Sequence, residues 1–468
     1  MKDTRPEVPK ALLVSIRIPE VTDESAEESL SELERLCTTL GFRTVGKQYQ
    51  RRPSTGTATV VGEGKLKELA QWTGGPGEIP KASFIKKSKV AEKNSQALED
   101  DSDDDFIEEE SFADSYDDAV SEPSAQVTET ADTVVFDCDL TPSQLKNLEG
   151  ALGVEVLDRT AVIIEIFSRH AKTRAAKLQV EIARLNYLAP RLRETGGPSE
   201  RMAGRGSGDT QIELDRRRIR DRVVELKSEL EGVQRELSNR RAQRSEQRTV
   251  ALVGYTNAGK SSMMRALTGS DVLVENKLFA TLDTTVRAMH PETQPRILVS
   301  DTVGFIKKLP HDLVASFRST LDEAHNAALL LYIVDASDPT FREQLEVTEQ
   351  VLSEVGVKDV PSLLILNKAD ALPDLQRKIL KRAFPDAVLM STRNPDDIKI
   401  LRERILQTFE KDMVEEELFV PYDIKGLIGD IRSHTRVVQE TFENTGIRYK
   451  LRADASELER IKKKYLQN

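Results

Sequence analysis

The sequence has few of the features that mark exported or membrane-spanning chains. Its 468 residues include two cysteines, Cys37 and Cys138, which is typical of a protein in a reducing compartment. No run of 18 apolar residues occurs, so no membrane span is expected. Residues 1–6 are polar and lack the apolar region of a secretory signal. These absences predict a soluble cytoplasmic chain, and a monomer is expected.

One segment lacks basic residues, and this changes how the net charge is interpreted. Between Glu99 and Glu122 there are 13 acidic residues and no Lys or Arg. Without them the formal net charge of −11 becomes +2. Residues 74–130 change from Gly/Pro-rich to Lys-rich to acidic, a composition that cannot bury enough surface to offset ordering entropy. We predict a disordered insert there, either a solvated insertion or an electrostatic tail that contacts a basic partner.

Around this insert, residues 1–168 predict a small α/β domain that resembles a nucleotide-binding unit. Ala161–Phe167 adds an apolar, β-branched run near its end. Strands are expected at 11–16, 43–50, 58–61, 133–136 and 155–157, and helices at about 25–40, 65–72 and 142–152.

Residues 169–248 predict an antiparallel helical hairpin. Apolar residues recur at helical spacing before a Gly-rich break, and from Ile219 to Leu237 they repeat at heptad spacing. The segment holds 20 basic residues, 17 of them Arg, against 12 acidic ones. Arginines clustered at Arg216–Arg218 suit phosphate groups of RNA. The alternative is a solvated surface whose charges pair internally at i,i+4.

Residues 249–410 alternate apolar strands with helices, which indicates a mainly parallel sheet covered on both faces. Residues 411–468 predict a small β-α-β unit, with strands at 418–420 and 446–452 around a helix at 424–434. In the larger domain, strands are expected at 250–253, 296–300, 329–334, 362–366 and 387–390.

The first strand of residues 249–410 leads into a phosphate-binding pattern, G-x-x-x-x-G-K-S. Glycines let backbone N–H groups surround a triphosphate, the lysine supplies charge to the β- and γ-phosphates, and the serine hydroxyl can ligate Mg²⁺. A helix starting there adds its dipole. The predicted phosphate-binding residues are Gly254, Tyr255, Thr256, Asn257, Ala258, Gly259, Lys260, Ser261 and Ser262.

Two further motifs follow strand ends. Asp301 can hold Mg²⁺ through water, and the N–H of Gly304 can reach the γ-phosphate. Asp370 can accept hydrogen bonds from guanine N1–H and its amine, where adenine presents the wrong pattern. Together with the phosphate loop, this set predicts a P-loop GTPase. The motif residues are Asp301, Thr302, Val303 and Gly304, then Asn367, Lys368, Ala369 and Asp370, with Ser391, Thr392 and Arg393 placed to close over the base.

The first switch segment is expected between these motifs, at Phe279, Ala280, Thr281, Leu282 and Asp283. Ser261 and Thr281 are the predicted Mg²⁺ ligands, with Thr284 and Thr285 as rivals to Thr281. Lys260, Thr281 and Gly304 are the predicted catalytic residues. Phe305 stands where many GTPases place a water-orienting Gln, so slow intrinsic turnover is expected.

The chain resembles the HflX GTPases, within the translation-factor-related class that includes Obg-like proteins. The resemblance covers about 400 residues and extends well upstream of the GTPase motifs. It is carried by Gly254–Ser261, Leu278–Asp283, Asp301–Ile306, Leu157–Thr160, Lys177–Glu181, Leu188–Leu192 and Thr210–Arg218.

This resemblance implies a cytoplasmic GTPase that binds GTP and GDP and associates with the large (50S) ribosomal subunit and its rRNA. It also implies that the protein splits or rescues stalled ribosomes under stress, with secondary ATP hydrolysis in some members. Two alternatives stay open. One is a signalling switch whose hairpin binds a protein partner through its heptad seam, and the other is an ATPase that acts on RNA structure.

Overall fold

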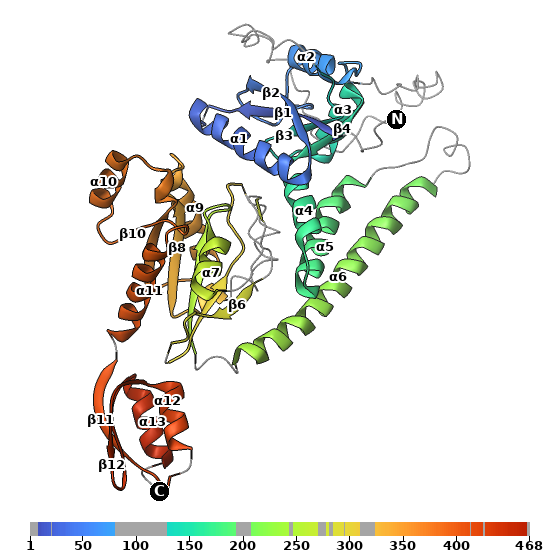
Figure 1. The fold of residues 1–468 in the computed structure, drawn as a ribbon. Coiled ribbons are helices and arrows are strands. Elements are labelled where there is room, and N and C mark those ends of the chain that lie inside the picture. The colour runs from blue at the N-terminus through green and yellow to red at the C-terminus, as the bar shows by residue number, and fades with distance from the viewer. Residues whose placement is uncertain are drawn as a thin grey trace, which may run out of the picture. The chain divides into compact units, whose positions relative to one another are not determined.

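The structure is a computed structural model, and the residues that it describes are 8–19, 21–79, 129–192, 207–242, 247–269, 278–279, 284–293, 295–308, 323–411, 413–424 and 426–465. The chain divides into two compact units, residues 1–163 and residues 164–468 (Figure 1). Most of the expected insert (80–128), the hairpin loop (193–206) and Ala280–Asp283 lie outside the described residues.

The first unit is built on a four-stranded parallel sheet in the order β2-β1-β3-β4. Local sequence determines the helix ends. Thr141 and Gln144 form a reciprocal capping box at the start of α3, and Gly153 ends that helix in the left-handed conformation. The elements are β1 (Lys10–Arg17), α1 (Asp23–Leu40), β2 (Arg43–Arg51), α2 (Glu63–Thr73), β3 (Thr133–Phe136), α3 (Pro142–Leu152) and β4 (Glu155–Asp158).

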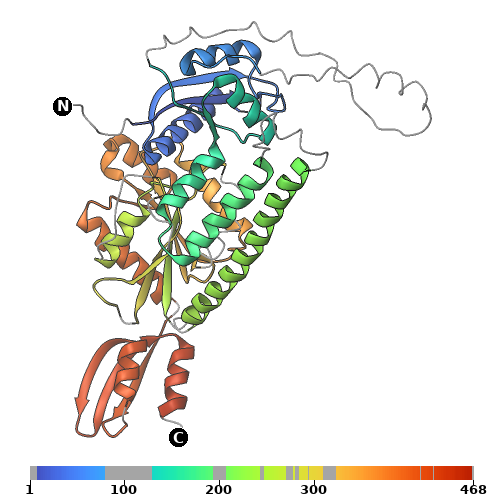
Figure 2. The same cartoon turned by 90° about the vertical axis from the view of Figure 1, so that its right-hand side faces the viewer.

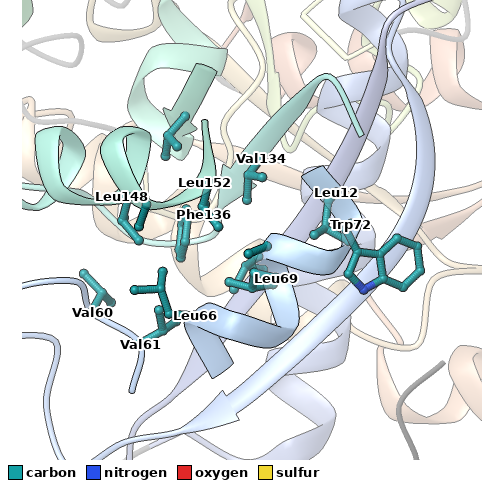
Figure 3. Close-up of a cluster of buried hydrophobic side chains, with 14 of the residues drawn as sticks. Leu12, Val60, Val61, Leu66, Leu69, Trp72, Val134, Phe136, Leu148 and Leu152 are labelled. Carbon is teal, nitrogen blue, oxygen red and sulfur yellow. The ribbon is translucent and has the colours of Figure 1, made fainter. Parts of the chain in front are cut away.

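A cluster of buried apolar side chains joins the parts of this unit that precede and follow the insert (Figure 3). Side chains of α2 and α3 pack on those of β1 and β3. Residues on both sides of the insert therefore fold together, as the sequence predicts. The core includes Leu12, Leu66, Leu69, Trp72, Val134, Phe136, Leu148 and Leu152.

The strand expected at 58–61 is wrong, because these residues form a turn. Val60 has a φ of 63°, and the Thr59 hydroxyl donates to the Val61 carbonyl at 2.7 Å. Val60 and Val61 are nevertheless buried in the core. The β-branched pair correctly indicated that these residues are buried, but they lie in a loop and not in a strand.

A buried ion cluster surrounds Arg159 at the start of α4 (Arg159–His170). Its guanidinium is 2.7 Å from Asp137 and also pairs with Glu32. Both carboxylates raise the pKa of Arg159, against the effect of its burial. Asp158 accepts a hydrogen bond from the Ala161 N–H at 2.7 Å, which caps the helix. The β-branched run Ala161–Phe167 is therefore helical.

The second unit contains the expected hairpin, α5 (Arg174–Leu188) with the short helix η1 (Ala189–Arg191), and α6 (Ser207–Ala242). Leu178 and Ile182 of α5 pack against Val223 and Leu226 of α6. Two ion pairs join the helices, Arg174 with Glu229 and Glu181 with Arg222. The residue numbers rise along α5 while they fall along α6, so the two helices are antiparallel (Figure 2).

The central sheet of this unit has the order β10-β9-β8-β5-β7-β6. Five strands are parallel, and β6, which the sequence did not predict, pairs antiparallel with β7. Helices α7 and α11 pack on one face, and α9 and α10 on the other. The elements are β5 (Arg248–Gly254), α7 (Lys260–Thr268), β6 (Thr285–Ala288), β7 (Ile297–Asp301), β8 (Leu329–Asp335), α9 (Phe341–Glu354), β9 (Ser362–Asn367), η3 (Ala369–Ala371), α10 (Asp374–Ala383), β10 (Val388–Leu389) and α11 (Pro395–Glu410).

The C-terminal residues form a three-stranded antiparallel sheet, β11-β13-β12, with two helices packed on it. The structure adds β12 and α13 to the expected elements. No helix in the described ranges is long and apolar enough to cross a membrane. The elements are β11 (Val414–Pro421), α12 (Leu427–His434), β12 (Arg436–Glu443), β13 (Gly446–Ala453) and α13 (Ala455–Tyr465).

Candidate nucleotide site

The loop between β5 and α7 requires glycine at both ends. Gly254 has a φ of 150° and Gly259 a φ of 101°, values that L side chains rarely adopt. A Cβ on Gly254 would lie 2.1 Å from the Ile333 carbonyl oxygen. A Cβ on Gly259 would lie 2.2 Å from Asn367 Nδ2. Backbone conformation and close packing therefore both account for the glycines of the phosphate-binding pattern.

Lys260 is the first residue of α7, and its buried side chain turns back onto this loop. Its Nζ donates to the carbonyls of Gly254 at 3.0 Å and Tyr255 at 2.7 Å. Burial lowers the pKa of Lys260 to about 8, although nearby Asp301 acts in the opposite direction. The lysine is therefore held by neutral carbonyls in a position from which phosphate oxygens could replace them.

Ser261, the second residue of α7, faces the end of β7. The Ser261 hydroxyl donates to the Asp301 carboxylate at 3.0 Å, and Asp301 is fully buried. The Thr302 hydroxyl donates to the Leu252 carbonyl at 2.7 Å, which fixes the turn after β7. Hydroxyl and carboxylate oxygens are the donors that Mg²⁺ prefers, so this pair suits a magnesium ion beside a bound phosphate.

The second motif also contacts the phosphate loop. A Cβ on Gly304 would lie 2.9 Å from both Lys260 Nζ and Thr256 Cα, so only glycine fits there without displacement. The next residue, Phe305, is buried. Its side chain is apolar and cannot orient water.

The base-reading motif is connected to the phosphate loop through one amide. Asn367 Nδ2 donates to the Ala258 carbonyl at 2.9 Å, and its Oδ1 accepts from the Thr392 N–H at 3.3 Å. Lys368 adopts a left-handed φ of 59°. This asparagine joins the phosphate loop to the segment expected to close over the base.

The Asp370 carboxylate is already oriented. The Ser391 hydroxyl donates to it at 2.6 Å and Arg393 Nη1 at 3.2 Å. The serine hydrogen bond is the largest of the influences that lower its pKa, so the group is ionised at neutral pH. The carboxylate can therefore accept from the two donors on the guanine edge.

Sequence reasoning missed Asp335 at the end of β8. Its carboxylate pairs with Lys368 Nζ at 2.6 Å, which holds the base-reading loop. The signal that could have found it is an acidic residue directly after an apolar strand, the same signal that indicated Asp301.

The first switch segment is represented by Leu278 and Phe279, since Ala280–Asp283 lie outside the described residues. Phe279 has a φ of 57°. Its ring packs edge-on against Phe167 of α4, with centroids 4.6 Å apart. The structure therefore places Phe279 in an apolar contact.

Thr285, one rival for the second magnesium ligand, lies in β6 opposite Asp301.

Three family models match the chain. One described as GTP-binding GTPase N-terminal matches residues 27–100 and 117–168. One described as GTP-binding GTPase Middle Region matches 170–244, and one described as 50S ribosome-binding GTPase matches 249–368. Together they cover most of both units.

Curated relatives extend over nearly the whole chain. The GTPase HflX of Gluconacetobacter diazotrophicus is 52% identical over 461 residues, covering 98% of this chain and 99% of that protein. The GTPase HflX of Caldanaerobacter subterraneus is 34% identical over 463 residues, covering 97% and 93%. A solved GTP-binding protein from Sulfolobus solfataricus, in complex with GDP, is 22% identical with a TM-score of 0.40, covering 85% and 98%.

Proposed function

Because the chain belongs to the HflX family of GTPases, we propose that it acts on the large ribosomal subunit and splits or rescues stalled ribosomes under stress. The protein binds and hydrolyses GTP. In this proposal it works in the cytoplasm, and the nucleotide state controls how the hairpin and N-terminal domain engage rRNA, because the γ-phosphate orders the switch segments.

The observation that carries this proposal is a row of exposed arginines on α6. Arg218 and Arg222 pair with neighbouring carboxylates. Within the described residues, no ion pair joins Arg216, Arg217 or Arg220 to another side chain. Internal i,i+4 pairing therefore does not account for the row. Exposed guanidinium groups that form no ion pair within the protein suit the backbone phosphates of RNA.

The rival proposal, a protein partner bound through the heptad seam, has less support. Val223 and Leu226 of the seam are buried against α5. A partner could reach them only by separating the hairpin.

Site roles follow from the contacts described above. Residues Gly254–Ser262 would surround the phosphates, and Asp370 would read guanine. Ser261 and Thr281 would ligate Mg²⁺, with Asp301 acting through water. When bound, Mg²⁺ supplies positive charge at the β- and γ-phosphates.

Catalysis would depend on three residues. Lys260 would neutralise charge that develops on the phosphates, Gly304 would donate its N–H to the γ-phosphate, and Thr281 would hold the metal. Phe305 cannot orient the attacking water, so intrinsic turnover is slow, and the ribosome supplies the missing positioning.

Co-sedimentation with purified 50S subunits tests the proposal. Binding should require a hydrolysis-resistant GTP analogue, weaken with salt, and fall when Arg216, Arg217 and Arg220 are changed to Glu. Each lost phosphate contact should reduce the slope of log affinity against log salt by about 1. The matched control reverses three exposed basic residues of α10, Lys378, Lys381 and Arg382, and should bind normally. Absence of 50S binding in every nucleotide state would contradict the proposal.

A further inference from the structure

A cavity lies at the opposite end of β5 from the phosphate loop. Its lining includes Arg248 and Ile297, which begin β5 and β7. The phosphate loop instead starts at Gly254, where β5 ends. The two ends of a strand of this length are about 20 Å apart. The cavity has a volume of about 270 Å³, near the lower limit for small-molecule sites, and it is separate from the nucleotide site.

The lining of this cavity combines charged and apolar side chains. Three arginines and one carboxylate contribute to it, namely Arg248, Arg402, Arg436 and Glu410. Leu406 and Phe409 of α11, together with Ile297, supply apolar surface. Small-molecule sites commonly have this composition, in which apolar side chains bury the body of a ligand and a few polar groups fix its orientation.

The positive charge of one lining arginine is not balanced by a neighbouring carboxylate. Arg248 Nη2 pairs with both carboxylate oxygens of Asp454 at 2.6 Å, and Arg436 pairs with Glu410. In the part of the chain that the structure describes, no acidic side chain pairs with Arg402. The cavity therefore has an excess of positive charge, and this excess lies at Arg402.

Most hydrogen-bond donors of Arg402 are also unused. A guanidinium group carries five N–H donors. Arg402 Nη2 donates to the Pro291 carbonyl at 2.9 Å, whereas neither Nε nor Nη1 has an acceptor among the described residues. Oxygens of carboxylates and phosphates are the acceptors that guanidinium groups bind most strongly. The unused donors and the unbalanced charge both indicate an anion with oxygen acceptors.

We propose that this cavity binds a small organic anion. Its phosphate or carboxylate group is held by Arg402, and its apolar body lies against Leu406 and Phe409. Arg248 and Arg436 add further N–H donors at the charged end. The proposal concerns neither the phosphate loop nor the ribosome, so it can fail without affecting the proposed function.

Phenyl phosphate carries both a phosphate group and an apolar ring, so it is the probe for this cavity. Calorimetric titration uses the full-length chain saturated with GDP and Mg²⁺, because bound GDP keeps the probe out of the phosphate loop. Phenyl phosphate should bind at one further site. Its affinity should exceed that of inorganic phosphate at least about tenfold at constant ionic strength, because the ring buries apolar surface.

Arg402→Gln tests the residue that carries the proposal. Loss of a charged hydrogen bond should lower the affinity for phenyl phosphate at least about tenfold. The matched control is Arg404→Gln, which removes an exposed arginine of the same helix and should bind the probe normally. GDP affinity and urea unfolding of both variants show whether each variant is folded.

Three outcomes would each overturn the proposal. They are an absence of phenyl phosphate binding to the GDP-saturated chain at millimolar concentration, equal affinities for phenyl phosphate and inorganic phosphate, and equal losses in the two variants. The comparison of the two probes uses the unaltered chain, so it remains decisive even if Arg402→Gln does not fold.

Discussion

Nucleotide affinity should depend on pH because of the environment of Lys260. Its ammonium is buried, and burial lowers its pKa to about 8 from an ordinary 10.5. Bound phosphates would favour the charged form strongly. Above pH 8, Lys260 must therefore take up a proton when nucleotide binds. The affinity for nucleotide falls as the pH rises, because a smaller fraction of the free protein carries that proton.

The size of the effect follows from the two protonation states. At pH 7 about nine-tenths of the free protein carries a charged Lys260, and at pH 9 about one-tenth does. The dissociation constant for GDP should therefore rise about tenfold between pH 7 and pH 9. Calorimetry in buffers of different ionisation enthalpy should detect uptake of close to one proton at pH 9.

Lys260→Arg is the control, because a guanidinium stays protonated throughout this range. Its binding should be weaker but nearly independent of pH between 7 and 9. The guanine base also loses its N1 proton in alkaline solution. This loss affects binding to the variant and to the wild type alike, so comparing the two isolates the contribution of Lys260. A wild-type constant that changes less than about twofold, or an arginine variant with the same slope as wild type, would refute the reasoning.

The same pKa predicts how stability varies with pH. Below pH 8 both the native and the unfolded chain carry the proton, and the buried charge destabilises the native state by about 3 kcal/mol. Between pH 8 and 10.5 the native state releases its proton first, so this contribution to unfolding free energy increases with pH. Lys260→Met should abolish this rise in urea titrations across that window.

Other substitutions have equally direct outcomes. Gly259→Ala puts a Cβ 2.2 Å from Asn367 Nδ2 at a left-handed backbone position, so GDP affinity should fall at least about tenfold in fluorescence titrations. Asp370→Asn should reduce GTP affinity about 100-fold and favour xanthosine triphosphate, whose 2-oxo group accepts from an amide N–H, in competition assays that include ATP. Arg159→Leu should lower unfolding free energy in urea by about 3–5 kcal/mol, because the buried Asp137 and the partly buried Glu32 lose their ion pairs with Arg159. Arg169→Leu, at an exposed pair, should cost at most about 1 kcal/mol.

Periodicity predicted the secondary structure well where local pattern and burial agree. The heptad positions Val223 and Leu226 of α6 are buried against α5, and Ile219, Leu230 and Val233 are partly buried there. The apolar runs of residues 249–410 are strands. At 58–61 and Ala161–Phe167 the β-branched residues indicated burial, but burial is compatible with a turn or a helix. Residues 58–61 form a short hydrogen-bonded turn, and the Asp158 carboxylate caps the helix that contains Ala161–Phe167.

The sequence by itself determined the phosphate-loop glycines, the lysine and the guanine-reading aspartate, because each depends on residue type within a few positions of a strand end. The tertiary structure decided the contacts between those motifs. Asn367 reaches Ala258 across 109 positions, and Tyr255 reaches Lys307 across 52. Sequence spacing contains no information about which strands become neighbours. Only the order of the folded sheet brings these loops together.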